Sequence, residues 1–275
     1  MHSGLDSGGH YENFPVASWV LPARFRAPVQ LIYAFARAAD DFADEGDVAD
    51  ALRLTRLREF TQELDRIEAE QPSAMPLFQR LGPMIRAHRL PIGLFRDLLS
   101  AFSQDVTTKR YSNFSELMDY CRRSANPVGR LLLHLYGETA PRSLAYSDGI
   151  CTSLQLINFL QDVPIDWSKG RVYLPLDELA RYGVDERQIG ASNSTGGWGA
   201  LMRYQTERAS NMLQAGAPLG RVLKGRLGLE LRMIVAGGQR ILDKLRDVDG
   251  DVFRHRPLLK KGDWLFMFLR ALRGS

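Results

Sequence analysis

Apolar residues recur at intervals of three and four along most of this chain, and alternating strand patterns are scarce. In residues 52–67, for example, one face of a helix would carry Leu57, Phe60, Leu64 and Ile67. This spacing predicts an all-α protein. The chain has 275 residues, which suits one large helical domain better than two ordinary ones.

The same pattern predicts where the longer helices lie. Residues 114–135 read as two helices or as one helix broken near Asn126-Pro127, and residues 143–163 read as one long apolar helix. Long helices resume over 201–214 and 220–246, after a flexible loop rich in glycine and serine. No repeat or linker divides the chain. We therefore expect a disordered segment over residues 1–9 and one helical domain over residues 10–275.

Composition and short motifs indicate the cellular compartment of the protein and argue against a zinc site. No apolar run reaches the roughly 18 residues that a membrane helix needs, and the first twenty residues contain no apolar segment typical of a signal peptide. Cys121 and Cys151 are the only cysteines, so we expect reduced thiols and a cytoplasmic protein. Neither a C-x-x-C nor an H-E-x-x-H motif is present to support a zinc site.

Positive charge is concentrated toward the C-terminus. Residues 219–275 contain 13 Lys or Arg and 6 Asp or Glu, whereas the whole chain has a formal net charge of +4. This excess suits an anionic partner such as a membrane surface or a phosphorylated substrate, but a solvated helix surface explains it equally well. No recognised nucleic-acid-binding motif is present, so we expect no nucleic-acid partner.

The first acidic motif follows an apolar helical run and reads Arg37-Ala-Ala-Asp-Asp-Phe-Ala-Asp-Glu45. Asp40 and Asp44 are four residues apart, so on a helix they lie one turn apart on the same face, where like charges repel. A divalent cation would relieve this repulsion, and Mg²⁺ binds carboxylates together with water and substrate phosphate. Taken alone, the motif is also consistent with an acidic helix end that leads into a turn at Gly46.

The second acidic motif makes a cation site the better interpretation. Asn158, Asp162 and Asp166 follow one another at intervals of four residues within an otherwise apolar helical segment. Unpaired carboxylates in apolar surroundings carry a large desolvation penalty, so they either reach solvent or coordinate an ion. Two such stripes on separate helices can face each other across a cavity. We therefore predict a Mg²⁺–diphosphate site between two helices.

These motifs resemble those of the squalene/phytoene synthase family, over nearly the whole chain. The first family motif is matched by residues 33–41, the second by residues 155–166, and the stretch after it by Gly170-Arg-Val-Tyr-Leu-Pro175. Within the family the resemblance is greatest to the hydroxysqualene synthase branch of hopanoid biosynthesis, through residues 12–18, 122–129, 158–162 and 251–257. Gln161 replaces the arginine usual before the second motif, and Arg123-Ser-Ala-Asn-Pro127 replaces the usual Tyr-bearing segment.

The resemblance implies an isoprenoid synthase helical bundle with a central active-site cavity. It implies that presqualene diphosphate and water become hydroxysqualene and diphosphate, in the pathway to squalene and hopanoids. The alternative is the head-to-head condensation of two farnesyl or geranylgeranyl diphosphates to squalene or phytoene. The implied cofactor is Mg²⁺, without a nicotinamide, and the implied functional partners are a presqualene diphosphate synthase and a hydroxysqualene reductase. A non-catalytic relative should have lost its acidic motifs, which are intact here.

Site residues follow from the motifs and the resemblance together. The expected metal ligands are Asp40, Asp44, Asn158, Asp162 and Asp166, with Asp41 as a lesser candidate. Arg37 and Arg171 are expected to bind the diphosphate. Tyr33 and Tyr173 are expected to stabilise the carbocation with their ring faces, and Asn126 is expected to position the water that captures it. Asn13 and Ser18 would either hydrogen-bond a phosphate or cap the first helix.

The C-terminal segment from Trp264 to Leu269 is apolar and is flanked by Lys260, Lys261, Arg270 and Arg273. One interpretation is a final helix packed on the domain. The other is peripheral contact with the inner face of an anionic membrane. Arg254 and Arg256, slightly earlier in the chain, could close over the diphosphate.

Overall fold

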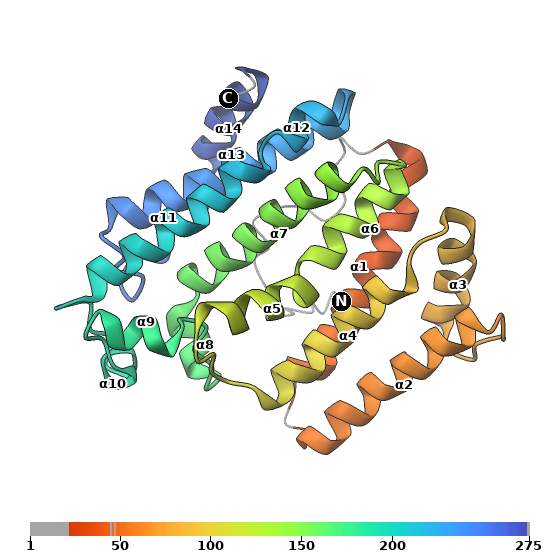
Figure 1. The fold of residues 1–275 in the computed structure, drawn as a ribbon, viewed down its shortest axis with the longest axis horizontal. Helices are drawn as coiled ribbons and strands as arrows, with labels where there is room; N and C mark the ends of the chain where they lie inside the picture. The colour runs from red at the N-terminus through yellow and green to blue at the C-terminus, as the bar shows by residue number, and fades with distance from the viewer. Residues whose placement is uncertain (1–21, 45, 47, 274–275) are drawn as a thin grey trace, which may run out of the picture.

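The structure is a computed structural model that describes residues 22–44, 46 and 48–273. All regular secondary structure in these residues is helical (Figure 1). In chain order the helices are α1 (Ala23–Asp44), α2 (Asp50–Glu68), α3 (Pro76–His88), α4 (Ile92–Thr107), α5 (Phe114–Ser124), α6 (Asn126–Tyr136), α7 (Pro141–Gln161), α8 (Val163–Ser168), α9 (Leu176–Arg181), α10 (Glu186–Gly190), α11 (Trp198–Gly216), α12 (Leu219–Val222), α13 (Gly225–Asp247) and α14 (Lys261–Arg273). The predicted all-α class is confirmed. The expected disorder of residues 1–9 concerns residues outside this description.

Local sequence signals account for several helix ends. The predicted interruption near Asn126-Pro127 separates α5 from α6, because Pro127 fits the first turn of a helix but not its interior. The start of α5 is capped, since Asn113 Oδ1 accepts a hydrogen bond from the Glu116 N–H at 3.1 Å. The Glu116 carboxylate accepts one from the Ser112 N–H at 2.8 Å. This reciprocal pair fixes the entry of the chain into α5.

The helices enclose two hydrophobic cores. One core lies among α1 to α4, where the ring of fully buried Phe35 contacts Phe60, Phe78 and Phe95. The other lies among α5, α7, α11 and α13. Helix α6 contributes to both, through Leu131 in the first core and Leu133 in the second. It therefore joins the two halves of the molecule, as its position between α1 and α7 in Figure 1 shows.

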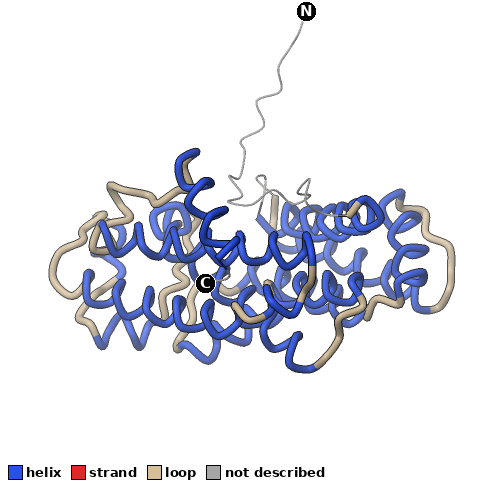
Figure 2. Tube along the Cα trace, turned by 90° about the horizontal axis from the view of Figure 1, so that it is seen from above, coloured by secondary structure: helices blue, strands red, loops and turns tan. Residues whose placement is uncertain are grey.

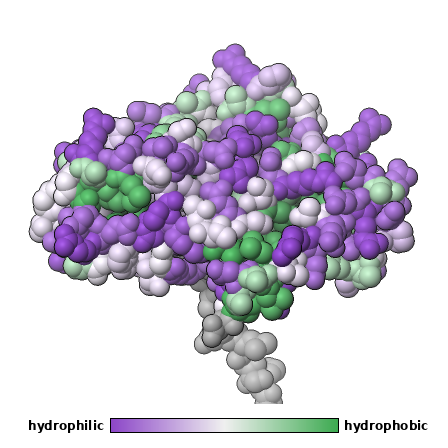
Figure 3. Space-filling model, turned by 60° about the horizontal axis from the view of Figure 1, so that its bottom comes forward, coloured by the Kyte–Doolittle hydropathy of each residue, from purple (hydrophilic) through white to green (hydrophobic). Residues whose placement is uncertain are grey.

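Seen from above, the helices lie in more than one layer, with the loops at the periphery (Figure 2). The face in Figure 3 is mainly hydrophilic, and its hydrophobic residues form separate patches. None of the helices that the structure describes has both the length and the apolarity needed to cross a bilayer.

Candidate active site

The first acidic motif occupies the last turns of α1, which ends at Asp44. This is an unfavourable place for carboxylates, because the carbonyl groups at a helix C-terminus carry partial negative charge, and the last turn of α1 has no basic residue. The compensation comes from a segment 125 residues away in the chain. The Lys169 ammonium pairs with one oxygen of Asp44, and Arg171 Nη1 lies 2.7 Å from the other.

The second acidic motif spans the junction between α7 and α8. The prediction of one continuous helix over 143–163 was wrong at its end, because Asp162 separates the two helices. Pro164 explains the interruption, since it has no N–H to donate to the carbonyl of Leu160. Hydrogen bonds nevertheless continue across it, from the Asp162 N–H to Asn158 O at 3.0 Å and from the Asp166 N–H to Asp162 O at 2.8 Å. The spacing that aligns the three ligand candidates therefore survives.

The two acidic motifs share one electrostatic environment. Burial, followed by the negative charge of nearby Asp162, raises the pKa of Asp166 to about 7. Asp44, from the other motif, adds to this rise, whereas Arg171 and Lys169 oppose it. Because the charge of Asp44, the last residue of α1, influences Asp166 in α8, the end of α1 lies close to α8. Asn158 is exposed, while Asp40, Asp44 and Asp162 are partly buried.

Arginine side chains border these carboxylates. Arg256 Nε lies 2.7 Å from Asp162 Oδ1, and Arg37 Nε lies 2.8 Å from Asp41 Oδ1. The side chain of Arg171 is only 11% exposed, and its buried Nε–H has no hydrogen-bond acceptor among the described residues. A buried donor without an acceptor costs free energy, so this group suits an anionic ligand.

Asp105 is a site residue that the sequence analysis missed. It lies on α4, is 6% exposed, and accepts a hydrogen bond from Tyr120 Oη at 2.7 Å and a longer one from Tyr173 Oη at 3.4 Å. Burial is the main reason why its pKa rises to about 6, and the charge of Asp40 contributes. The sequence contained one signal that Asp105 is buried: it lies on the apolar face of the helix, seven residues after Leu98 and three after Phe102.

Tyr173 and Tyr33 lie in different surroundings. Tyr173 is buried and stacks on Phe159, with ring centroids 3.8 Å apart and an interplanar angle of 7°. Tyr111 and Tyr120 complete this aromatic group beside Asp105. Tyr33 instead lines an apolar cavity of about 190 Å³ between α1, α6, α7 and α13.

The apolar cavity and the carboxylates lie along the same helices. On α1, Tyr33 precedes Asp40 by seven residues, and on α7, the cavity residue Leu154 precedes Asp162 by eight. At a rise of about 1.5 Å per residue, both separations amount to roughly 10–12 Å. Carboxylates at one end and an apolar cavity at the other are what a molecule with a charged head and a hydrocarbon chain requires.

Two of the residues that distinguish the branch, Gln161 and Asn126, are buried. Gln161 is 1% exposed, and its Nε2 donates to Pro257 O at 2.6 Å, so it anchors the loop that carries Arg256. Asn126 is 6% exposed, and its Oδ1 accepts a hydrogen bond from Thr152 Oγ1 at 2.8 Å. Arg254 pairs with Asp251, and it has no ion pair with the described residues of either acidic motif. Asn13 and Ser18 lie outside the described residues.

The oxygen donors of the two motifs suit a hard divalent cation such as Mg²⁺. In the part of the chain that the structure describes, no three Asp, Glu, His or Cys side chains group closely enough to form a metal site. Asp44 and Asp162 are paired with Lys169, Arg171 and Arg256 instead. Burial is the first cause of the raised pKa of Asp166, and the negative charges of Asp162 and Asp44 add to it; a bound cation would favour the ionised form of this carboxyl group.

Comparison with known proteins agrees with this geometry. A sequence model of the family "Squalene/phytoene synthase" matches residues 8–263. Hydroxysqualene synthase of Rhodopseudomonas palustris is 38% identical over 242 residues, which cover 86% of this chain and 80% of that protein. Hydroxysqualene synthase of Sinorhizobium fredii is 37% identical over 240 residues, with the same coverage. The crystal structure of squalene synthase HpnC from Alicyclobacillus acidocaldarius aligns with a TM-score of 0.81 at 33% identity and covers 87% of this chain and 90% of that one.

Proposed function

Because this chain belongs to the squalene/phytoene synthase family, whose members are prenyltransferase-type enzymes, we propose that it is a hydroxysqualene synthase. Presqualene diphosphate and water would give hydroxysqualene, diphosphate and a proton, in the pathway to squalene and hopanoids. The bond from carbon to the diphosphate oxygen breaks, and the diphosphate leaves with the electron pair. Water then forms a new carbon–oxygen bond with the rearranged cation and loses the proton.

The observation that carries the proposal is the convergence of two acidic motifs beside the buried guanidinium of Arg171, on helices that also line an apolar cavity further along their length. A diphosphate group needs cationic partners and its hydrocarbon chain needs an apolar lining. Arg171 and Arg37 would bind the diphosphate oxygens, since a guanidinium can donate two parallel hydrogen bonds.

The expected Mg²⁺ ligands are Asp40, Asp44, Asn158, Asp162 and Asp166, with Asp41 as a lesser candidate. Bound Mg²⁺ would neutralise charge on the leaving diphosphate. Lys169, Arg171 and Arg256 now pair with the carboxylates of these motifs. On substrate binding, these basic side chains would turn from the carboxylates to the diphosphate.

Residues deeper in the protein would control the carbocation. Tyr33 and Tyr173 would stabilise positive charge with their ring faces, and the hydrogen bond to Asp105 orients the Tyr173 hydroxyl. Asn126 would position water through its amide group, while Thr152 holds its Oδ1. If Asn126→Ala forms hydroxysqualene at the wild-type yield, this role is wrong.

The decisive test is incubation of the purified protein with presqualene diphosphate and Mg²⁺, followed by mass spectrometry of the products. We expect hydroxysqualene, and at least a hundredfold slower formation by Asp40→Asn and Asp162→Asn, since each removes a carboxylate that would hold the Mg²⁺ that neutralises the leaving diphosphate. Asp185→Asn is the matched control, because Asp185 is a surface carboxylate paired with Arg187. No alcohol from the wild-type protein would contradict the proposal.

The second candidate is head-to-head condensation to squalene or phytoene, the two products that the family description names. It is distinguished by supplying farnesyl or geranylgeranyl diphosphate, with and without NADPH. Squalene or phytoene from these substrates, together with inertness toward presqualene diphosphate, would favour condensation. Hydroxysqualene from presqualene diphosphate without NADPH would favour hydration.

A further inference from the structure

Helix α14 has an exposed apolar face that has no role in the proposed reaction. Eight large hydrophobic residues are exposed in the described part of the chain, and five of them belong to this one helix. They are Trp264, Leu265, Phe268, Leu269 and Leu272, with exposed fractions between 38% and 66%. Such a concentration on one short helix is unusual for a surface that faces only water.

The geometry of α14 gathers these residues on one side. Positions 264, 265, 268, 269 and 272 follow the helical repeat, so they form a continuous stripe. The opposite side, formed by Asp263, Met267 and Ala271, is buried, and α14 packs mainly against α13. The sequence left open whether this helix packs on the domain or faces a membrane. One side packs on the domain, which leaves the apolar stripe facing outward.

The charge around the stripe is positive. Asp263 is the one acidic residue of α14, and it points inward, where Arg240 Nε lies 2.7 Å and Lys244 Nζ 2.5 Å from its oxygens. Lys260 and Lys261, at the start of the helix, are exposed. Within α14 and the two lysines at its start, the outward charge therefore comes from basic residues.

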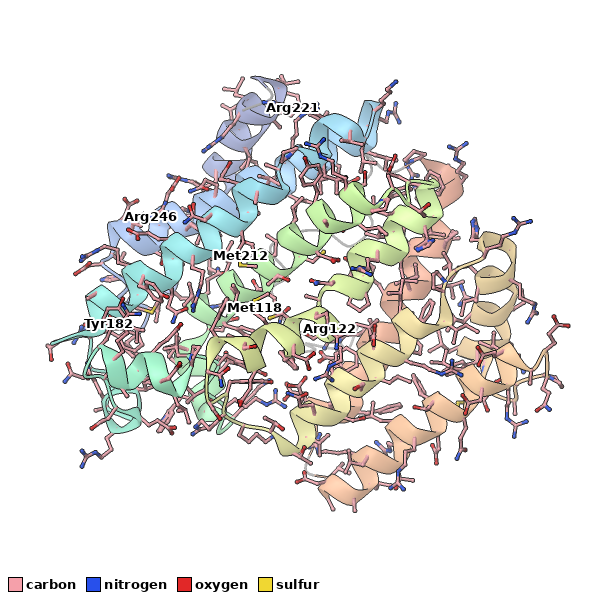
Figure 4. All side chains as sticks on the ribbon, viewed as in Figure 1. Met118, Arg122, Tyr182, Met212, Arg221 and Arg246 are labelled. Atoms are coloured by element: carbon pink, nitrogen blue, oxygen red, sulfur yellow. The ribbon has the colours of Figure 1, made fainter. Side chains whose placement is uncertain are left out.

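A pocket lined by arginines adjoins the same helix. It has a volume of about 200 Å³, and Arg221, Arg232 and Arg270 line it from α12, α13 and α14. Arg232 of α13 links the two neighbouring helices, because its Nε donates to Ala271 O of α14 at 2.8 Å and its Nη1 donates to Gly220 O of α12 at 2.9 Å. Figure 4 shows Arg221 beside α14 at this edge of the molecule. Guanidinium groups so arranged suit a phosphate group.

We propose that α14 and the arginine pocket form a docking surface for an anionic lipid bilayer. The apolar stripe would enter the boundary between headgroups and acyl chains, and the basic residues would contact lipid phosphates. A second copy of this chain fits less well, because apposing two such faces would bring their positive charges together. This inference does not depend on which isoprenoid product the enzyme forms.

The test is flotation of the full chain with vesicles of phosphatidylcholine alone or with added phosphatidylglycerol, without substrate. We expect binding to the anionic vesicles that weakens as salt rises, and little binding to the neutral ones. Leu265→Ser/Leu269→Ser should reduce binding at least tenfold. Leu52→Ser is the matched control, since Leu52 is 47% exposed on α2, and it should bind as the wild type does.

The charge contribution is tested by Arg221→Gln/Arg270→Gln, which should weaken binding roughly fivefold per charge. Arg187→Gln, at a highly exposed arginine elsewhere, should leave it unchanged. Circular dichroism verifies that each variant is folded. Absence of binding to anionic vesicles, or equal losses in the α14 variants and the controls, would overturn the proposal. So would a wild-type dimer that Leu265→Ser/Leu269→Ser converts to a monomer.

Discussion

Asp105→Asn is expected to make the protein more stable at neutral pH, although it removes a charged residue from the site. Burial raises the pKa of Asp105 to about 6 from an ordinary value of 3.8. The folded protein therefore holds the proton more tightly than the unfolded chain does. Stability from this carboxyl is fully present below the unfolded pKa and is lost as the pH rises through the folded pKa.

The magnitude follows from the difference between the two pKa values. About two units, at about 1.4 kcal/mol per unit, give a cost of about 3 kcal/mol above pH 6. Asparagine avoids this cost because it carries no charge, and its carbonyl oxygen can still accept the hydrogen bond from Tyr120. The unfolding free energy of Asp105→Asn minus that of the wild type should thus be about 2–3 kcal/mol larger at pH 7.5 than at pH 4.

The assay is urea unfolding of the wild type and the variant at several pH values between 4 and 7.5. Comparing the two proteins at each pH cancels the titration of the other carboxyl groups. Asp119→Asn is a control of opposite sign, because hydrogen bonds from Arg122 and Arg123 lower the pKa of Asp119. A difference between Asp105→Asn and wild type that does not change with pH, or that favours the wild type as pH rises, would refute the reasoning.

Two further substitutions test the packing around the site. Gly129→Ala should destabilise the protein by about 1–3 kcal/mol, because the added methyl group would overlap Ser147 Oγ and Cys151 Sγ beside the apolar cavity; an unchanged urea midpoint would contradict this. Gln161→Ala should cost about 1–3 kcal/mol in urea unfolding, because it leaves the buried carbonyl of Pro257 without its donor. It should also raise KM for the diphosphate substrate through the loosened loop, whereas a purely structural role would leave KM unchanged.

The sequence predicted elements whose cause is local. The apolar repeat over residues 52–67 corresponds to α2, and Pro127 marked the boundary between α5 and α6. Pro164 marks the boundary between α7 and α8 in the same way, whereas the apolar pattern over residues 143–163 predicted one helix without a break. The spacing persisted through the interruption, so the prediction about the acidic residues did not require the helix to be continuous.

Features that depend on distant segments were not predictable in the same way. Nothing in the local sequence connects Asp44 with Lys169 and Arg171, since the contact exists only after the bundle forms. Asp105 lies in no motif, and its importance depends on Tyr120 and Tyr173 from other segments. Gln161 was noted as a departure from the family pattern, but its link to Pro257 required the folded structure.

The central claim is that this site ionises a prenyl diphosphate and lets water capture the resulting cation. Incubation with presqualene diphosphate and Mg²⁺ in ¹⁸O-labelled water tests it most directly, with mass spectrometry of the alcohol. If the carbon–oxygen bond to diphosphate breaks and water adds to carbon, hydroxysqualene will carry the label. An unlabelled alcohol would mean that the phosphorus–oxygen bond broke instead, and that result would contradict the account.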